Sequence, residues 1–319
     1  MPRTTPSAQT GPATHAGAAG RAGTPRPALR PGRAHGPGRA TPSWRLSRWG
    51  ANLLTYTFLI AGALLMLGPF VFSVMTALKT PEQFATSWPL TLPNPATGEN
   101  FSTLFTGRYD FIVPIAVTVQ VVLVLLVGQM VCSILAAYAF AHLNFPGRDV
   151  LFWLYVATLM IPVVVTVIPL YSMMTSVGLK NTFAGLVLPF LFGSPYAIFL
   201  LRENFRSTPQ DILDAATIDG AGVLRRLWQV MVPMNKPIIA TLLLITVVTQ
   251  WNSFMWPLII APSQEWSVLT VATASLQTQY AGNWTLVMAA TTIALAPLVI
   301  LFLIFQKQIT SSLGVTGVR

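Results

Sequence analysis

Six long apolar stretches constrain this chain more than any other feature of its sequence. Each meets the length of roughly 20 residues that an α-helix needs to cross the hydrocarbon core of a bilayer, and none contains Asp, Glu, Lys, Arg or His. Backbone N–H and C=O groups in lipid must be hydrogen-bonded within their own segment, which favours helices. We therefore predict an all-α integral membrane protein whose six transmembrane helices lie at about residues 53–78, 114–140, 150–171, 183–201, 238–260 and 284–305.

The composition supports this class. Hydrophobic residues make up 53% of the 319 residues and charged residues only 9%, against about a quarter in soluble domains. The net charge of +10 does not indicate nucleic-acid binding, because the basic residues gather in the first 50 positions and at the ends of the apolar stretches. Residues 1–43, rich in Pro, Gly, Ala and Arg, are predicted to be a disordered tail, and residues 44–319 the transmembrane domain. Cys132 is the single cysteine, which excludes an intrachain disulfide and a cysteine metal cluster.

The distribution of basic residues also predicts the orientation. With the N-terminus in the cytoplasm, sixteen of the 19 Lys and Arg residues lie on the cytoplasmic side, and only Lys79, Arg108 and Lys180 lie outside. Cytoplasmic loops of membrane proteins carry such an excess. We predict a multi-pass protein of the cytoplasmic membrane with both termini in the cytoplasm, and this places the charged loop at residues 203–237 there too.

The first part of this loop carries signals for the start of a helix. Thr208 is a suitable N-cap, Pro209 suits the first helical position, and Asp211 can complete a capping box with Thr208. We therefore expect a helix to begin at Pro209, with small and apolar side chains along it that allow another surface to approach closely.

The second part of the loop is predicted to turn and then to continue as a helix. Asp219 and Gly220 favour a turn, and the apolar residues from Val223 onward recur at spacings of three and four until Pro233, where the helix is expected to end. Two interpretations remain open on physical grounds alone. The segment is either a hairpin that lies on the membrane surface or a docking element that transmits movement from a cytoplasmic partner to the spans.

The run DAATIDGAG at residues 214–222 resembles the EAA loop of ABC importer permeases, with Asp214 where that family usually has Glu. The family pattern is Glu-Ala-Ala, three residues, Gly, and then an apolar helix ending in proline. Other segments are similar to carbohydrate importer permeases of the maltose-transporter class, and most of all to its smaller six-span subunit: SPYAIFLLRENFRSTPQDILDAATIDGAG, VPMNKPIIATLLL, QWNSFMWPLI and SSLGVTGVR. The resemblance covers about residues 50–319 and implies an ABC type I importer permease fold.

The resemblance implies that residues 209–221 form a coupling helix that docks into a cleft of a cytoplasmic ATP-hydrolysing subunit. The coupling residues would be Asp214, Ala215, Ala216, Asp219, Gly220 and Ala221. The implied partners are a homologous permease that completes a heterodimer, ATP-binding subunits, an extracytoplasmic solute-binding protein, a sugar and membrane lipid. The chain has no Gly-rich phosphate-binding loop, so ATP and Mg²⁺ are expected in the partner, and no cofactor in this chain.

Polar side chains inside the spans are the candidates for the transport pathway. The spans hold no ionisable group, which weighs against an ion-coupled transporter and agrees with a neutral solute. Most such polar side chains are expected to bond neighbouring helices. The cluster of Gln250, Trp251, Asn252 and Ser253 is denser than that role requires, and we predict that it lines the pathway or its gate. On the outer side, the resemblance implies that residues 273–283 contact the solute-binding protein.

Two alternatives remain open. The first is an ABC permease for another solute, such as a polyol, glycerol phosphate or an amino acid, although a phosphorylated solute would favour cationic residues along the passage. The second is a membrane scaffold or an intramembrane enzyme, which would need buried His, Asp or Glu pairs that the spans lack. The sequence therefore predicts no enzyme, and it assigns no catalytic or metal-binding residue.

Overall fold

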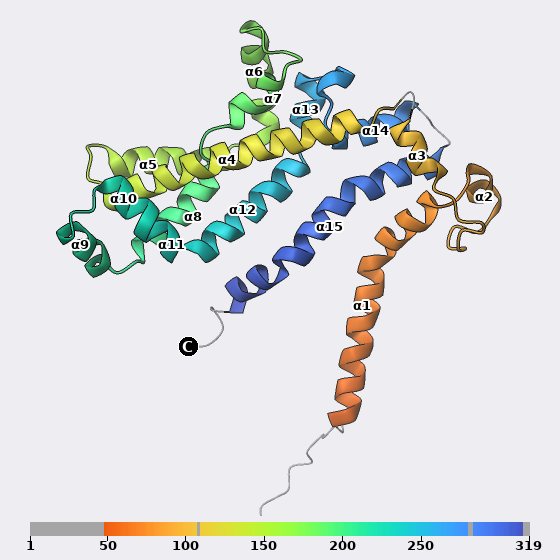
Figure 1. Ribbon diagram of the computed structural model, residues 1–319, viewed down its shortest axis with the longest axis horizontal. Helices are drawn as coiled ribbons and strands as arrows, with labels where there is room; N and C mark the ends of the chain where they lie inside the picture. The colour runs from red at the N-terminus through yellow and green to blue at the C-terminus, as the bar shows by residue number, and fades with distance from the viewer. Residues whose placement is uncertain (1–47, 107–108, 280–282, 315–319) are drawn as a thin grey trace, which may run out of the picture. The chain divides into compact units, whose positions relative to one another are not determined.

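The computed structural model describes residues 48–106, 109–279 and 283–314, and within these ranges it consists of helices without a β-strand (Figure 1). The chain divides into two compact units, residues 1–58 and 59–319. Helix α1 (Arg48–Ala77) begins in the first unit and continues into the second, which contains every contact discussed below. The tail predicted at residues 1–43 lies outside the described residues.

Five helical segments are long and apolar enough to cross a membrane. Three are single helices, namely α1, α4 (Ile112–His142) and α15 (Trp284–Gly314). The other two are interrupted. Residues 183–206 comprise α7 (Phe183–Val187), the 3₁₀ turn η2 (Leu188–Phe190) and α8 (Pro195–Arg206), and residues 236–260 comprise α12 (Lys236–Trp251) and α13 (Met255–Ile260).

The span predicted at residues 150–171 is sharply bent. The segment of α5 (Arg148–Ala157) and the 3₁₀ turn η1 (Thr158–Met160) meets α6 (Val163–Ser176) at 103°, and the two make a sixth span only when they are taken together. Pro162 explains the break, because a proline lacks the N–H donor and disfavours the helical conformation of the preceding residue. Ile161 is accordingly extended, with φ −83° and ψ 117°. Pro69 and Pro297, in contrast, lie inside unbroken helices.

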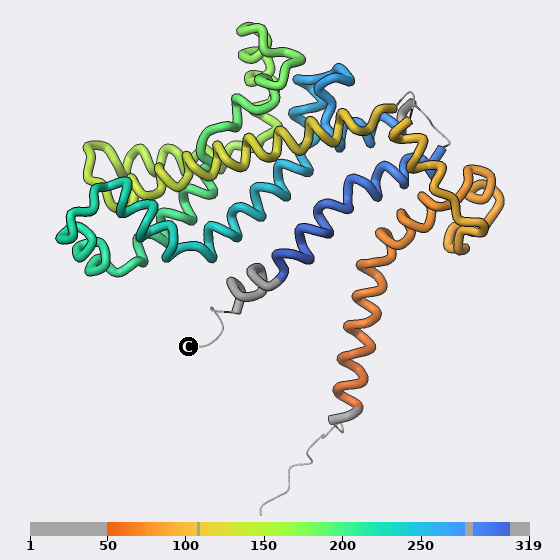
Figure 2. Tube along the Cα trace, in the orientation of Figure 1, coloured from red at the N-terminus to blue at the C-terminus, as the bar shows by residue number. Residues whose placement is uncertain are grey.

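Helix α4 forms the centre of the core, because it packs along both α8 and α12 (Figures 1 and 2). Ile134 of α4, Leu201 of α8 and Leu242 of α12 belong to one buried cluster and are at most 4% exposed. The helices approach most closely at Gly128, where a Cβ atom would lie 2.5 Å from Cδ1 of Leu191 and 2.6 Å from its carbonyl oxygen. A side chain at residue 128 would therefore force apart α4 and the irregular segment before α8.

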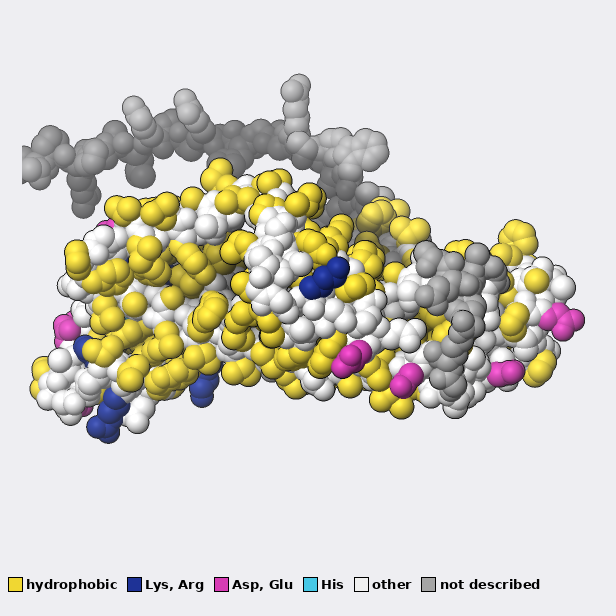
Figure 3. Space-filling model, turned by 90° about the horizontal axis from the view of Figure 1, so that it is seen from above, with side chains coloured by type: hydrophobic (Ala, Val, Ile, Leu, Met, Phe, Trp, Pro, Cys, Tyr) yellow, Lys and Arg dark blue, Asp and Glu magenta, His cyan; other side chains and the backbone are white. Residues whose placement is uncertain are grey.

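Short helices connect the spans. They are α2 (Pro81–Thr86), α3 (Glu99–Phe105), α9 (Gln210–Ile218), α10 (Val223–Arg226), the π-helical turn η3 (Leu227–Met231), α11 (Val232–Met234), the 3₁₀ turn η4 (Gln264–Trp266) and α14 (Leu269–Gln279). Hydrophobic side chains cover much of the face seen in Figure 3. Exposed apolar surface of this extent is typical of helices that face lipid or another membrane helix.

Candidate functional site

Helix α9 begins one residue later than its sequence predicts. It starts at Gln210, and Pro209 occupies the cap position with φ −56° and ψ 128°, without a side-chain cap hydrogen bond. The prediction that Thr208 caps this helix is therefore wrong. The backbone N–H of Thr208 instead donates to the carbonyl of Phe205 over 3.1 Å, so that Thr208 belongs to the turn that closes α8.

The turn predicted at Asp219 and Gly220 is confirmed. The N–H of Ala221 donates to the carbonyl of Ala216 over 2.9 Å, and the N–H of Gly220 donates to that of Thr217 over 3.0 Å. These two hydrogen bonds form a Schellman motif, in which the residue after the last helical turn adopts the left-handed conformation. Gly220 is that residue, with φ +78°. No atom lies within 4 Å of where its Cβ would be, so the backbone conformation, and not lack of space, requires glycine here.

The six predicted coupling residues lie together on and after α9. Asp214, Ala215, Asp219 and Gly220 are exposed, and Ala216 and Ala221 are half-buried. Gln210, one turn before Asp214, donates from Nε2 to its Oδ1 over 3.2 Å. Between the two carboxylates lie Ala215, Ala216, Thr217 and Ile218, and Ile218 is 86% exposed. The small side chains of Ala215 and Gly220 leave the backbone open to close approach by another protein. Their contact with an ATP-binding subunit stays a prediction.

The opposite side of α9 packs against the buried core of the protein. Leu213 is 2% exposed and belongs to the same buried cluster as Phe205 of α8, Leu227 and Met231. A full burial of this kind stabilises by about 1.5–3 kcal/mol per side chain. Arg226 adds a hydrogen bond from Nη1 to Oγ1 of Thr217 over 2.8 Å. Leu213 thus joins α9 to a buried cluster that α4 and α8 also share.

The helix after the turn does not end at Pro233 as predicted. It continues through the π-helical turn at Leu227–Met231 to Met234, and the N–H of Val232 donates to the carbonyl of Leu227 five residues earlier. A proline normally breaks an α-helix because its ring meets the carbonyl of the preceding turn. The wider π turn lies immediately before this proline, so the helix accommodates the ring and extends by one residue.

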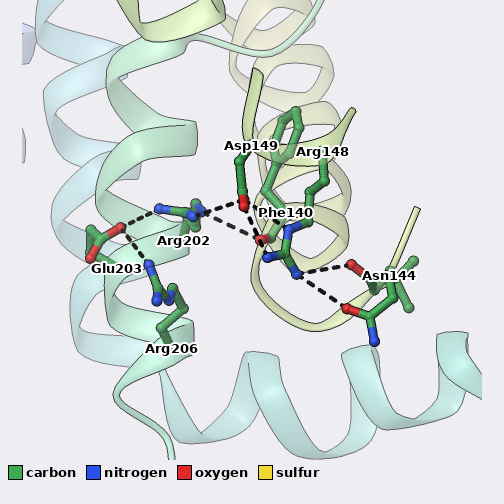
Figure 4. A network of polar contacts seen from close by, with 8 residues as sticks. Phe140, Asn144, Arg148, Asp149, Arg202, Glu203 and Arg206 are labelled. Atoms are coloured by element: carbon green, nitrogen blue, oxygen red, sulfur yellow. Dashed lines mark hydrogen bonds and ion pairs between the residues drawn. The ribbon is translucent and has the colours of Figure 1, made fainter. Parts of the chain in front are cut away.

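A polar network joins α8 to the connection between α4 and α5 (Figure 4). The side chain of Arg202 is 8% exposed and pairs with Glu203 Oε1 at 2.6 Å and with Asp149 Oδ1 at 3.8 Å. Its Nε donates to the carbonyl of Phe140 over 3.4 Å, and its guanidinium carbon lies 3.8 Å from the centroid of the Phe152 ring. Arginine suits a buried position that combines an aromatic face with several acceptors.

The rest of this network is more exposed. Arg148 pairs with Asp149 at 2.9 Å and also donates to Asn144 Oδ1 over 3.3 Å. Sequence reasoning used Arg202 only for orientation and missed its structural role. The sequence feature that could have indicated this role is a basic residue one position after an apolar stretch, followed directly by the acidic residue Glu203. Since α8 leads into α9, the network fixes the helix that precedes the predicted coupling residues.

A cavity of about 290 Å³ with both polar and apolar walls opens between α4, the N-terminus of α8 and α12. Its lining residues are Gln129, Ser194, Tyr196, Ala197, Leu242, Ile245, Thr246, Thr249 and Gln250. The side-chain amide of Gln129 donates to the carbonyl of Phe190 over 2.7 Å, and that of Gln250 donates to Gln129 Oε1 over 3.4 Å. The cavity therefore brings amide and hydroxyl groups from three segments to one place within the spans.

Of the four predicted pathway residues, only Gln250 lines this cavity. Trp251 is 7% exposed and donates from Nε1 to the carbonyl of Ala294 on α15 over 3.0 Å. Asn252 donates from Nδ2 to the carbonyl of Val248 over 2.8 Å. Ser253 accepts a hydrogen bond on its carbonyl from Thr270. The four residues thus diverge to different surroundings, and their part in transport stays a prediction.

The outer segment at residues 273–283 is described only in part, because residues 280–282 lie outside the described ranges. Ser275 and Leu276 of α14 line a second cavity of about 490 Å³, whose walls also include the carboxylates of Asp110 and Glu265. Contact of this segment with a solute-binding protein stays a prediction.

Comparison with known proteins gives consistent matches. Residues 129–314 match the family described as binding-protein-dependent transport system inner membrane component. The sn-glycerol-3-phosphate transport system permease protein of Yersinia pestis is 32% identical over 282 residues, covering 82% of this chain and 95% of that protein. The diacetylchitobiose uptake system permease protein of Streptomyces coelicolor is 31% identical over 268 residues, covering 82% and 87%. A crystal structure of a bacterial ABC transporter that imports the acidic polysaccharide alginate contains a similar chain, with TM-score 0.72, 22% identity and coverage of 84% and 99%.

Proposed function

This chain belongs to the family of inner membrane components of binding-protein-dependent transport systems, and from this premise we propose that it is a permease subunit of an ABC importer for a sugar. It is a multi-pass protein of the cytoplasmic membrane, from a family of transport permeases and not of enzymes. The sugar is proposed from the named solute of the diacetylchitobiose permease and from a cavity lined by amides and hydroxyls. In this proposal the chain performs no chemical reaction itself.

One observation carries the proposal, namely that α9 is exposed on one side and anchored on the other. Its small residues are open to a partner, while Leu213 is 2% exposed in the core of the spans. A surface hairpin that only lay on a membrane would need no such anchor in the buried cluster of the spans. We propose that ATP-binding subunits hold α9, bind ATP and Mg²⁺, and drive the spans between inward-open and outward-open states. A ligand that binds one of two conformations more tightly shifts the equilibrium toward it, and ATP binding in the partner can change the conformation of the spans in this way.

The proposed complex has further partners. A homologous permease would cover the exposed apolar faces of the spans and complete the pathway, and a solute-binding protein would deliver the sugar from outside. The family description, which names transport that depends on a binding protein, supports the latter. Lipid surrounds the assembly, and nucleic acid has no role in it.

The assembly is tested by co-purification in detergent of the co-expressed permease pair and its ATP-binding subunit. Ala215 is exposed, so Ala215→Arg should leave the fold intact and, by placing a long charged side chain on the docking face, should remove most of the ATP-binding subunit. Leu224→Arg, at a residue that is 62% exposed on α10, is the matched control and should retain it. If the wild-type chain brings down no ATP-binding subunit, the importer proposal fails.

The orientation is tested with single cysteines. After Cys132→Ala, a single cysteine is introduced at one of two positions. One is Ile218, which is 86% exposed on α9; the other is Trp88, which is 73% exposed and lies in the segment after α1 that is predicted to be outside the cell. A maleimide that cannot cross membranes should label the Trp88→Cys protein in intact cells, and the Ile218→Cys protein only after permeabilisation. The reverse labelling pattern would contradict the prediction that both termini lie in the cytoplasm.

A second candidate solute is glycerol phosphate or a polyol. The observation that favours it is the relative of 32% identity, which is named for sn-glycerol 3-phosphate. The lining of the cavity between α4, α8 and α12 includes no cationic side chain that would pair with a phosphate, although the partner permease can supply one.

A further inference from the structure

We propose that the loop between α1 and α3, residues 78–98, is a docking surface for the solute-binding protein. The inference rests on the proposed function, because it states where and by what chemistry one partner of that assembly binds. The surface consists of an exposed apolar segment, residues 88–92, flanked by the carboxylates of Glu82 and Glu99. The complementary surface on the partner is an apolar patch with lysine or arginine side chains at its edge.

The first step of the inference concerns a buried lysine. Lys79 is 1% exposed, and it forms no ion pair within the described part of the chain. Its Nζ donates to the carbonyls of Trp88 and Pro89, over 3.5 Å and 3.1 Å, and to Oγ1 of Thr91 over 3.2 Å. Lysine is almost never fully buried unless its charge is paired. Here three neutral oxygens of one turn accept from the three N–H groups of the ammonium, so that Lys79 fixes the turn by its oxygens and leaves its side chains outside.

The second step concerns the rest of the loop, which is held by further hydrogen bonds. The side chains and backbones of Thr80 and Gln83 form a capping box at the start of α2. Nε2 of Gln83 also donates to the carbonyls of Asn94 and Pro95, over 2.6 Å and 3.2 Å. A surface that is already ordered loses little conformational entropy when a partner binds. The loop is therefore preorganised for an interaction.

The base of the loop is fixed to two spans. Nδ2 of Asn100, a residue that is 6% exposed, donates to the carbonyls of Ala77 and Lys79, over 2.7 Å and 2.8 Å. Its Oδ1 accepts from the hydroxyl of Thr285, at the start of α15, over 3.0 Å. The surface is thus held in a defined position relative to the ends of α1 and α15.

The third step concerns the side chains that the loop exposes. Trp88, Leu90 and Leu92 are 73%, 66% and 78% exposed. Large apolar side chains gathered on a surface mark a site of interaction with a protein or a membrane. Tryptophan is among the residues that contribute most to the affinity of protein interfaces, so Trp88 is the expected centre of the contact.

The fourth step concerns the charge, which distinguishes a protein from lipid. Residues 80–106 contain Glu82 and Glu99 and no lysine or arginine, and both carboxylates are exposed without an ion pair among the described residues. On the face seen in Figure 3, the described charged side chains at the end that carries α2 are acidic. Segments that bind membrane surfaces instead carry basic residues beside their apolar side chains. The acidic edge therefore favours a protein partner with a basic edge.

The test measures binding of the purified solute-binding protein of the same transporter to the complex of the permease pair and ATP-binding subunits in lipid nanodiscs. Trp88→Ser should weaken this binding at least tenfold, as loss of a central aromatic side chain does. Val177, which is 64% exposed in the connection between α6 and α7, is predicted to lie on the same side of the membrane. Val177→Ser is the matched control and should bind as the wild type does.

The charge is tested by the double variant Glu82→Lys and Glu99→Lys. Association should slow by about tenfold at low salt, and the difference from the wild type should shrink at high salt, because salt screens exposed charges. Lys79→Met removes the ammonium at similar side-chain length. It should weaken binding and also increase the mobility of a nitroxide attached at residue 88, and the second effect is specific to the loss of order in the turn.

A measurement without the partner distinguishes the loop from a lipid anchor. After Cys132→Ala, a nitroxide is attached to Trp88→Cys in the nanodisc complex. A water-soluble nickel chelate should reach it, because the apolar segment faces water until the partner binds. A nitroxide that is accessible to oxygen and not to the chelate would place this segment in lipid and overturn the inference.

The outcomes separate this inference from the proposed function. Unchanged binding in both the Trp88→Ser complex and the complex with two lysines, or no binding to the wild-type complex, would also overturn the inference. A complex that still assembles and hydrolyses ATP in these cases leaves the importer proposal in place. A chain that assembles with no ATP-binding subunit overturns both.

Discussion

Replacing Gly220 with valine should abolish ATP-dependent uptake and release the ATP-binding subunit from the complex. The φ of +78° costs a residue with a side chain about 1–2 kcal/mol, and a β-branched residue tolerates it least. The turn after α9 would therefore open and move the coupling residues away from one another. Uptake into proteoliposomes and co-purification in detergent measure the two effects.

Gly222 offers a matched control two residues away. It has an ordinary extended backbone with φ −67° and ψ 170°, and its Cβ, like that of Gly220, would meet no atom within 4 Å. Gly222→Val should therefore retain the ATP-binding subunit, and Gly220→Asn should retain it in part, because asparagine tolerates positive φ. Equal loss in both valine variants would show that bulk, and not backbone conformation, decides the interaction.

Removing Arg202 should uncouple ATP hydrolysis from transport and lower the stability of the complex. Arg202→Ala deletes the ion pair at 2.6 Å to Glu203 and the contact at 3.8 Å to the Phe152 ring. The lost hydrogen bonds to a charged group and the lost cation–π contact together destabilise by about 2–3 kcal/mol. Glu203 and Asp149, with side chains 47% and 62% exposed, can be rehydrated, which keeps the loss below that of a fully buried pair. Thermal unfolding in detergent and the ratio of ATP hydrolysed to solute imported check this.

The control for Arg202 lies one helical turn away in α8. Arg206 is 54% exposed and 3.9 Å from Glu203, so Arg206→Ala should change stability by less than about 1 kcal/mol, as exposed ion pairs do. If the two alanine variants are equally stable and equally coupled, the network does not transmit movement from α9. Arg202→Lys should fall between them, because an ammonium cannot both stack on Phe152 and reach its two acceptors.

The positions of the spans could be predicted from the sequence because they depend on the length and polarity of single segments. The bend at Pro162 could not, since Pro69 and Pro297 also lie within apolar stretches and leave their helices unbroken. Whether a proline interrupts a membrane helix depends on which neighbouring groups satisfy the freed backbone. That information resides in tertiary contacts and not in the local sequence.

The candidate site shows the same division between local and distant causes. The turn at Gly220 is a property of a few adjacent residues, and the sequence predicted it. The cap predicted at Thr208 is wrong because α9 begins only at Gln210, and Thr208 still belongs to the turn that closes α8. The burial of Arg202 depends on Asp149, which is more than fifty residues away in the chain. The predicted cluster after Gln250 dispersed because the chain leaves the helix at Asn252 and consecutive helical residues point in different directions.

The π-helical turn at Leu227–Met231 gives this chain some freedom in its length. A π turn contains one residue more than an α-helical turn over nearly the same path. A related chain that lacks one residue in this stretch can close an ordinary α turn there, and its next transmembrane segment then keeps the same side chains toward the cavity. The length of the chain can therefore change by one residue at this point, between α9 and α12, without a change in the direction in which α12 leaves the turn.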